Sequence, residues 1–109
     1  MIVEFKGWRC ILLPGKRYLQ QDRIALQLVD VEDGEPIATA SVNIAEEDLP
    51  MEDNEVFIKN YSENEGMTDA LIAAGVISPE VIKTVQTGFV EVSSYLLTEQ
   101  AYNHLTQRK

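Results

Sequence analysis

One stretch of this chain, residues 23–45 (RIALQLVDVEDGEPIATASVNIA), limits the folds open to it more than any other. Aliphatic side chains alternate with small or polar ones along two arms that flank Asp33-Gly34, which is the period of a half-buried strand. Both aliphatic sets fall at even-numbered positions. They share a face of the hairpin only when the residue numbers of each cross-strand pair add up to an even number. The stretch therefore predicts an antiparallel β-hairpin with one apolar side.

The turn of this hairpin follows from the register. A two-residue Asp33-Gly34 turn would set leucines opposite serines, because a slip of one residue reverses every side chain. A three-residue loop, 32–34, is predicted instead: a type I turn that closes in a G1 bulge, with Gly34 in the left-handed conformation. Small residues then oppose large ones, which predicts a helix packed over them. The expected pairs are Val31:Glu35, Leu28:Ala38, Leu26:Ala40 and Ile24:Val42.

Length and composition indicate a single globular domain, residues 1–109, because 45% of the side chains are hydrophobic and 25% are charged. No apolar run reaches the roughly 18 residues that cross a bilayer. The first residues lack the pattern of a signal peptide, so we expect a cytoplasmic protein. Cys10 is the only cysteine, which excludes an intrachain disulfide. It lies in an apolar run and is expected to be a buried hydrophobic side chain rather than a nucleophile.

The charge is uneven along the chain, which has a net charge of −9. Residues 30–69 hold thirteen acids and one base, residues 1–29 hold five bases and two acids, and residues 70–109 hold three of each. An acidic middle repels nucleic-acid phosphates and attracts basic protein surfaces. We therefore expect no direct nucleic-acid binding; the acidic middle serves as a solubilising surface or meets a basic partner.

Further strands are expected on both sides of the hairpin. Residues 2–13 are rich in β-branched and aromatic side chains and predict one or two strands broken at Gly7, followed by a Pro14-Gly15 turn. Residues 16–19 are expected to resume as a strand. Residues 46–55 carry six carboxylates and no base, so they are expected to form a solvated loop. Val56-Phe57-Ile58 then predicts a short buried strand.

The clearest helix signal is Ser62-Glu63-Asn64-Glu65, a capping box that predicts a helix over about 63–74. Gly75 is expected to end this helix in the left-handed conformation. The helix is the element expected to cover the small residues of the hairpin. Its apolar stripe consists of Met67, Ala70, Leu71 and Ala74.

The C-terminal third mixes helix and strand signals. Ser78-Pro79 predicts a helix start with room for about one turn, up to Lys83. Residues 84–97 are strand-like and interrupted at Gly88. Thr98 is expected to cap a C-terminal helix whose buried face carries Ala101 and Leu105. His104, in the same helix, is expected to be a solvated surface residue.

Together these signals predict an α+β fold: a mainly antiparallel twisted sheet, with one helix (about 63–74) packed on a face and a C-terminal helix at an edge. Exposed edge strands are a feature of such sheets. A homodimer through an edge strand is therefore an open option.

The sequence contains no phosphate-binding loop, dinucleotide glycine pattern or metal-ligand spacing, so we predict no catalytic residue, cofactor or metal site. One weak candidate binding site is the junction of strand and helix, where polar side chains can converge on a ligand. The alternative is that these residues only cap the helix. The candidates are Lys59, Asn60, Tyr61, Ser62, Glu63, Asn64 and Glu65.

A second weak candidate is Trp8, which stands beside Arg9 and near Lys16, Arg17 and Tyr18. Aromatic and basic side chains together can stack on a base or anchor a partner. The alternative is that this single tryptophan belongs to the core.

Three stretches of the chain resemble a family of short proteins that is labelled only as a domain of unknown function: IALQLVDVEDGEPIATASVNI, EVFIKNYSENEGMTDALIAAGVI and TGFVEV. The family is carried on plasmids, phages and integrative elements of gut and related bacteria. The resemblance spans roughly Ile24 to Val92 and is most specific over Phe57–Gly66. It implies no activity, cofactor or catalytic residue, only a context: a cytoplasmic accessory protein of a mobile element.

Three functions follow as hypotheses. The preferred one is a non-enzymatic protein-binding or regulatory module that uses its acidic middle or residues 59–66. The second is an acidic inhibitor that mimics nucleic acid and blocks a host enzyme. The third is a small-molecule binder or enzyme centred on Tyr61, Ser62 and Glu65.

Overall fold

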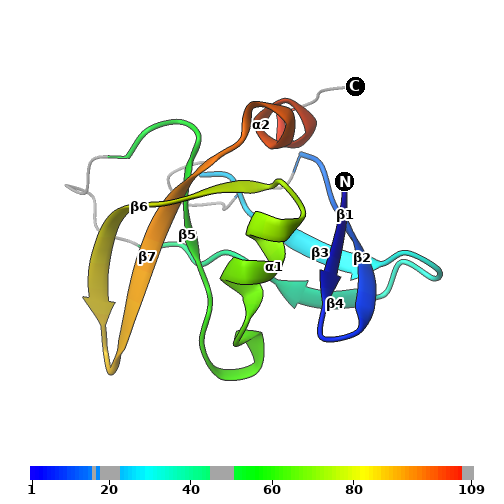
Figure 1. Cartoon of the computed structure of the whole chain (residues 1–109), viewed down its shortest axis with the longest axis horizontal. Coiled ribbons are helices and arrows are strands. Elements are labelled where there is room, and N and C mark those ends of the chain that lie inside the picture. The colour runs from blue at the N-terminus through cyan, green and yellow to red at the C-terminus, as the bar shows by residue number, and fades with distance from the viewer. Residues whose placement is uncertain (16, 18–22, 45–50, 107–109) are drawn as a thin grey trace.

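A computed structural model describes residues 1–15, 17, 23–44 and 51–106 (Figure 1). Its strands form two antiparallel sheets, with strand orders β1-β2-β3-β4 and β5-β7-β6, and two short α-helices accompany them. The expected α+β fold is therefore confirmed. Over the described ranges, no helix is long and apolar enough to span a membrane. The elements are β1 (Ile2–Phe5), β2 (Trp8–Leu12), β3 (Gln27–Asp30), β4 (Pro36–Thr39), β5 (Glu55–Ile58), the 3₁₀ helix η1 (Ser62–Asn64), α1 (Met67–Ala73), β6 (Ile77–Thr87), β7 (Val90–Leu97) and α2 (Glu99–Leu105).

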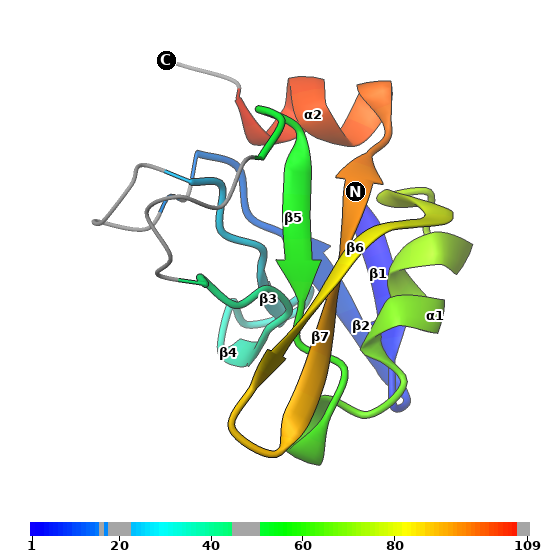
Figure 2. The same cartoon turned by 90° about the vertical axis from the view of Figure 1, so that its left-hand side faces the viewer.

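The two sheets are joined by the backbone that follows β4. Ser41 forms an antiparallel bridge with Ile58, and the Val42 N–H donates to the Phe57 carbonyl at 3.0 Å. Hydrogen bonding therefore continues from the first sheet into the second, and the strands curve around one core (Figure 2). Both sheets and both helices contribute side chains to that core, among them Val3, Leu12, Leu26, Val56, Leu71 and Leu105.

The N-terminal strands form a tight hairpin. Phe5 faces Trp8, and Lys6 and Gly7 between them both have positive φ, at 50° and 83°. A two-residue loop with two positive φ angles is a type I′ turn, whose twist matches that of the flanking strands. The predicted break at Gly7 is confirmed.

The central hairpin keeps part of its predicted register. Leu28 faces Ala38, and Gly34 has a φ of 73°, both as expected. The loop is longer than predicted, because the Asp30 N–H donates to the Glu35 carbonyl at 2.8 Å. The register shifts between Leu28 and Val29, because Val29 faces Pro36 whereas Leu28 faces Ala38. Farther from the turn the pairing therefore follows the predicted register.

The second arm of this hairpin ends sooner than predicted. The Ala40 N–H still donates to the Leu26 carbonyl at 2.7 Å. Beyond that point Val42 turns to β5, while Ile24 bridges Arg17. The predicted pair Ile24:Val42 is therefore wrong, because the arm leaves the first sheet to join the second.

Helix α1 begins later than the capping box predicted. Ser62 has a φ of 55° and opens the 3₁₀ helix, and no side chain caps that turn. The capping box is therefore wrong. The side chain that caps α1 comes from farther back, because Asn60 Oδ1 accepts the Thr68 N–H at 2.8 Å.

The body and end of α1 follow the prediction. Met67 and Leu71 are fully buried. Gly75 has a φ of 74°, its N–H donates to Ile72, and the Val76 N–H donates to Leu71 at 2.9 Å. These two bonds form a Schellman motif, which satisfies the last carbonyls of the helix.

Helix α1 lies against β1 and β6, the outer strands of the two sheets (Figure 2). The helix was expected to cover Ala38 and Ala40; Leu26, Ala40 and Leu71 do share one core, while the main contacts of the helix are with β1 and β6. The helix thus packs against one edge strand of each sheet. At one end of the molecule α2 lies across the strands, where the Gly15 N–H donates to the Leu105 carbonyl at 2.9 Å (Figure 1).

The expected cap of α2 is present, since Thr98 Oγ1 accepts the Ala101 N–H at 3.2 Å.

The helical turn predicted at Ser78-Pro79 is wrong, because these residues belong to β6. Proline has no N–H to donate, and an outer strand tolerates it where a central strand does not. The interruption expected at Gly88 is confirmed, and it is the turn of a β-hairpin: Thr87 faces Val90, and Gly88 has a φ of 60°.

Candidate functional site

The segment between β5 and α1 holds seven of the candidate residues, and two of them form an exposed ion pair. The Lys59 ammonium donates to Glu63 Oε1 and lies 5.7 Å from the centre of the Tyr61 ring. The hydrogen bond to Glu63 raises the pKa of Lys59, and the same bond lowers the pKa of Glu63. Because both groups meet water, the pair orients the loop more than it stabilises the fold.

Two asparagines fasten this segment to the rest of the molecule. Asn60 caps α1, as described above. Asn64 is buried, and its Nδ2 donates to the Thr39 carbonyl at the end of β4, at 2.8 Å. The helix-capping alternative therefore describes part of the segment, with Asn60 as the cap.

Within the described residues, the side chains of Tyr61, Ser62 and Glu65 form no hydrogen bond of this kind to another element. Tyr61 packs at the margin of a small apolar cluster formed by Ile44, Phe57 and Val92. Ser62 and Glu65 are exposed. The local geometry offers two exposed polar groups beside a half-buried phenol ring.

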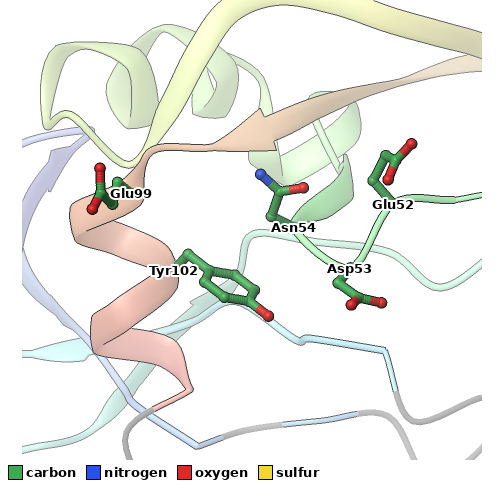
Figure 3. A pocket seen from close by; sticks show the side chains of 5 residues that line it. All are labelled: Glu52, Asp53, Asn54, Glu99 and Tyr102. Atoms are coloured by element: carbon green, nitrogen blue, oxygen red, sulfur yellow. The ribbon is translucent and has the colours of Figure 1, made fainter.

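The described residues form a hollow of about 440 Å³ elsewhere, where the segment before β5 meets α2 (Figure 3). The Tyr102 ring extends from α2 toward Asp53. Glu52 and Glu99 lie at opposite ends of the hollow. Among the described residues, no three His, Cys, Asp or Glu side chains are placed to hold a metal ion. The hollow is an open acidic surface with one aromatic wall, and none of its lining residues belongs to 59–66.

Trp8 is 52% exposed, so the alternative that it belongs to the core is wrong. It lies at the start of β2, opposite the buried Phe5. Cys10 and Leu12 continue the same side of the strand and are fully buried. Trp8 therefore stands where the core-facing side of β2 reaches the surface.

The two candidate spots lie next to each other. Lys6, in the turn before Trp8, donates from Nζ to the Glu63 carbonyl at 2.9 Å. The same ammonium lies 5.5 Å from the centre of the Phe5 ring. Figure 2 shows the β1–β2 turn beside the segment that leads into α1. Of the basic and aromatic neighbours expected near Trp8, Arg17 bridges Ile24, while Lys16 and Tyr18 lie outside the described residues.

A buried carboxylate at the start of β5 was not expected. Residues 46–55 were predicted to be a solvated loop; Glu52 and Asp53 are exposed as expected, but Glu55 is only 4% exposed. Its Oε2 accepts the Ser94 hydroxyl at 2.6 Å and lies 3.0 Å from Lys83 Nζ. The Glu52 N–H donates to Oε1 at 3.1 Å. Residues 46–50 of the predicted segment lie outside the described residues.

Burial by itself raises the pKa of Glu55, but the hydrogen bonds from Ser94, Glu52 and Lys83 outweigh burial and lower the pKa overall. The carboxylate is therefore held ionised. Its sequence signal was its place directly before a buried strand. Ser94 is fully buried and its hydroxyl donates a hydrogen bond to the carboxylate, so this cluster links β5, β6 and β7.

The side chains of Cys10 and His104 are both at least partly withdrawn from the surface. Cys10 is fully buried as expected, and burial, with a smaller effect of Asp30, raises the pKa of its thiol. His104 is half-buried, and its Nε2 lies 2.7 Å from the Leu12 carbonyl. The prediction of a solvated surface histidine is wrong, because the ring links α2 to β2.

The described acidic residues are divided among separate elements. Four of them lie in or beside the β3–β4 turn, others precede β5, and others flank η1 and α1; Figure 1 shows these elements apart.

Comparisons of the chain with protein-family models, curated proteins and solved structures found no match. The resemblance noted in the sequence therefore stays an expectation.

Proposed function

We propose that this chain is a non-enzymatic protein-binding module whose contact surface is centred on Trp8 and includes the adjoining η1 turn. The observation that carries the proposal is the exposure of Trp8 on a strand whose next inward-facing residues are fully buried. Tryptophan is the side chain most enriched at the centres of protein interfaces, because it removes a large apolar area from water with little loss of conformational freedom.

The polar neighbours of Trp8 support a binding role. Lys6, from the turn before Trp8, and Lys59 both contact Glu63, so these bonds orient the η1 turn before a partner arrives. A preformed surface binds at a smaller entropy cost than one that must order itself. The net charge of −9 favours a basic partner.

The other two hypotheses gain less from the structure. Four of the seven polar candidates use their side chains in hydrogen bonds within the chain, which leaves fewer groups to hold a small molecule. A mimic of nucleic acid needs an ordered row of charges, whereas the described carboxylates lie on separate elements. The regulatory role on a mobile element rests on the sequence resemblance.

The test is affinity capture from the cells that make the protein, with wild type, Trp8→Ala and Ile2→Ala compared. Ile2 is a matched control, because it is a similarly exposed apolar residue on the neighbouring strand. We expect a specific partner with wild type and Ile2→Ala, and its loss with Trp8→Ala. A partner retained by Trp8→Ala, or the lack of any specific partner, would contradict the proposal.

A further inference from the structure

The β6–β7 hairpin carries an exposed apolar surface separate from Trp8. Among the described residues, six large hydrophobic side chains are exposed, and three of them are on this hairpin: Val81, Ile82 and Phe89. Phe89 occupies the two-residue turn and is 104% exposed. The hairpin extends away from the rest of the fold (Figures 1 and 2).

Strand β6 has two unlike halves along its outer edge. The first half contains Pro79, contacts α1 and has register irregularities between Ile77 and Lys83. Proline, irregularities and lysine are the devices that keep edge strands from pairing. The second half, Thr84–Thr87, has none of them and pairs with β7 in continuous register. In the described chain, no strand lies on the other side of β6.

From this arrangement we infer that the second half of β6 pairs with a second copy of the chain, antiparallel and around a two-fold axis at Val85. Antiparallel pairing of identical strands is isologous, so each contact occurs twice. An axis at Val85 sets Thr84 opposite the partner's Gln86. It also brings Val81 and Ile82 close to the partner's Phe89. The three exposed hydrophobic side chains are thus covered reciprocally.

The charges of the chain permit this contact. No residue from Thr84 to Phe89 is charged, and Lys83 pairs with Glu55 of its own chain. Residues 70–109 carry equal numbers of acids and bases. The acidic β3–β4 turn lies at the opposite end of the longest axis, which measures 39 Å (Figure 1). Because these turns lie away from the paired strands and the Debye length is about 8 Å at physiological ionic strength, the acidic turns of two copies repel each other weakly.

The contact is small, which sets its expected strength. Covering one phenylalanine in each copy removes about 400 Å² from water, from about 200 Å² each. Stable specific interfaces bury roughly 1,200–2,000 Å² in total. We therefore expect a reversible dimer that forms at micromolar or higher concentrations.

The first test is sedimentation equilibrium of the full chain from low micromolar to near-millimolar concentration. Wild type is expected to pass from monomer to dimer, and Phe89→Ala is expected to weaken dimerisation by about tenfold or more. Phe89 is exposed in a turn, so its loss leaves the fold intact. A wild-type monomer at every concentration, or a Phe89→Ala dimer of unchanged affinity, overturns the inference.

The second test examines the register with two matched double variants. Thr84→Lys with Gln86→Glu places opposite charges across the proposed axis, and Thr84→Lys with Gln86→Lys places like charges there. Both lose the same internal contacts, Thr84 to Ser93 and Gln86 to Gly88. The first variant is expected to dimerise more tightly than the second; equal affinities exclude an axis at Val85.

Trp8→Ala separates this inference from the proposed function. The inference stands independently of Trp8, so this variant is expected to dimerise like wild type. A monomeric Trp8→Ala variant places the self-association surface at β2 and overturns the inference.

Discussion

The two ends of β5 carry the same pair of residue types in opposite surroundings. At its start Glu55 meets Lys83 with a carboxylate side chain that is 1% exposed, and just past its end Lys59 meets Glu63, whose side chain is 68% exposed. The buried carboxylate has lost its water and depends on protein donors from three sides. The exposed one keeps water as an alternative partner. The comparison teaches that surroundings, more than the contact itself, decide what an ion pair contributes.

The largest expected effect comes from breaking the buried pair. Glu55→Ala removes the carboxylate that pairs with Lys83 and accepts the Ser94 hydroxyl, and it should lower the free energy of unfolding by about 3 kcal/mol. Urea denaturation measures the change. The double variant Glu55→Leu with Lys83→Met removes both charges and is expected to recover much of the loss. A Glu55→Ala variant as stable as wild type would show that the cluster does not support the fold.

The pH dependence of stability examines the same carboxylate. Because the pKa of Glu55 is lower in the folded chain, its contribution is fully present above the ordinary glutamate pKa of about 4.3. That contribution is lost as the pH falls through the lowered folded value. The stability difference between wild type and Glu55→Gln should therefore be constant near neutral pH and shrink in acid. A difference that grows on acidification would reverse the assigned direction of the pKa.

A smaller effect is expected at the α1 cap. Asn60→Ala removes the acceptor of the Thr68 N–H and should cost about 1 kcal/mol, the usual worth of a helix cap. Ser62→Ala is the matched control, because the serine side chain makes no cap bond. Chemical denaturation of both variants measures the effect. The reverse order of stability would restore the capping box predicted from the sequence.

The smallest effect is expected at the exposed pair. Lys59→Met should leave the denaturation midpoint nearly unchanged, since the Glu63 carboxylate is already hydrated. Any change should fade as salt is added, because salt screens exposed charges. A loss comparable to that of Glu55→Ala would remove the contrast between the two ends of β5.

Local patterns predicted the parts of the fold that depend on neighbouring residues. Alternation around Gly34 gave two strands and the Leu28:Ala38 pair, and helical spacing gave the buried side of α1. Thr98 predicted the start of α2 because its hydroxyl acts on its own helix.

The errors arose where distant residues decide the outcome. Glu55 is buried because Lys83 and Ser94 reach it from 28 and 39 residues away. Pro79 suits a helix start or an outer strand equally well, and only the sheet order selects between them. The sequence pointed to residues 59–65 and to Trp8 as two separate candidates. The contact between Lys6 and Glu63, which brings these two candidates together, depends on the fold.

Helix α1 is seven residues long and touches β1 and β6, the outermost strands of the two sheets. Detachment of this one short helix would uncover part of both sheet borders at once. Unpaired strand borders recruit other chains and start fibrous deposits. Asn60 and Gly75, which set the two ends of this helix, therefore also help to keep these strand borders covered.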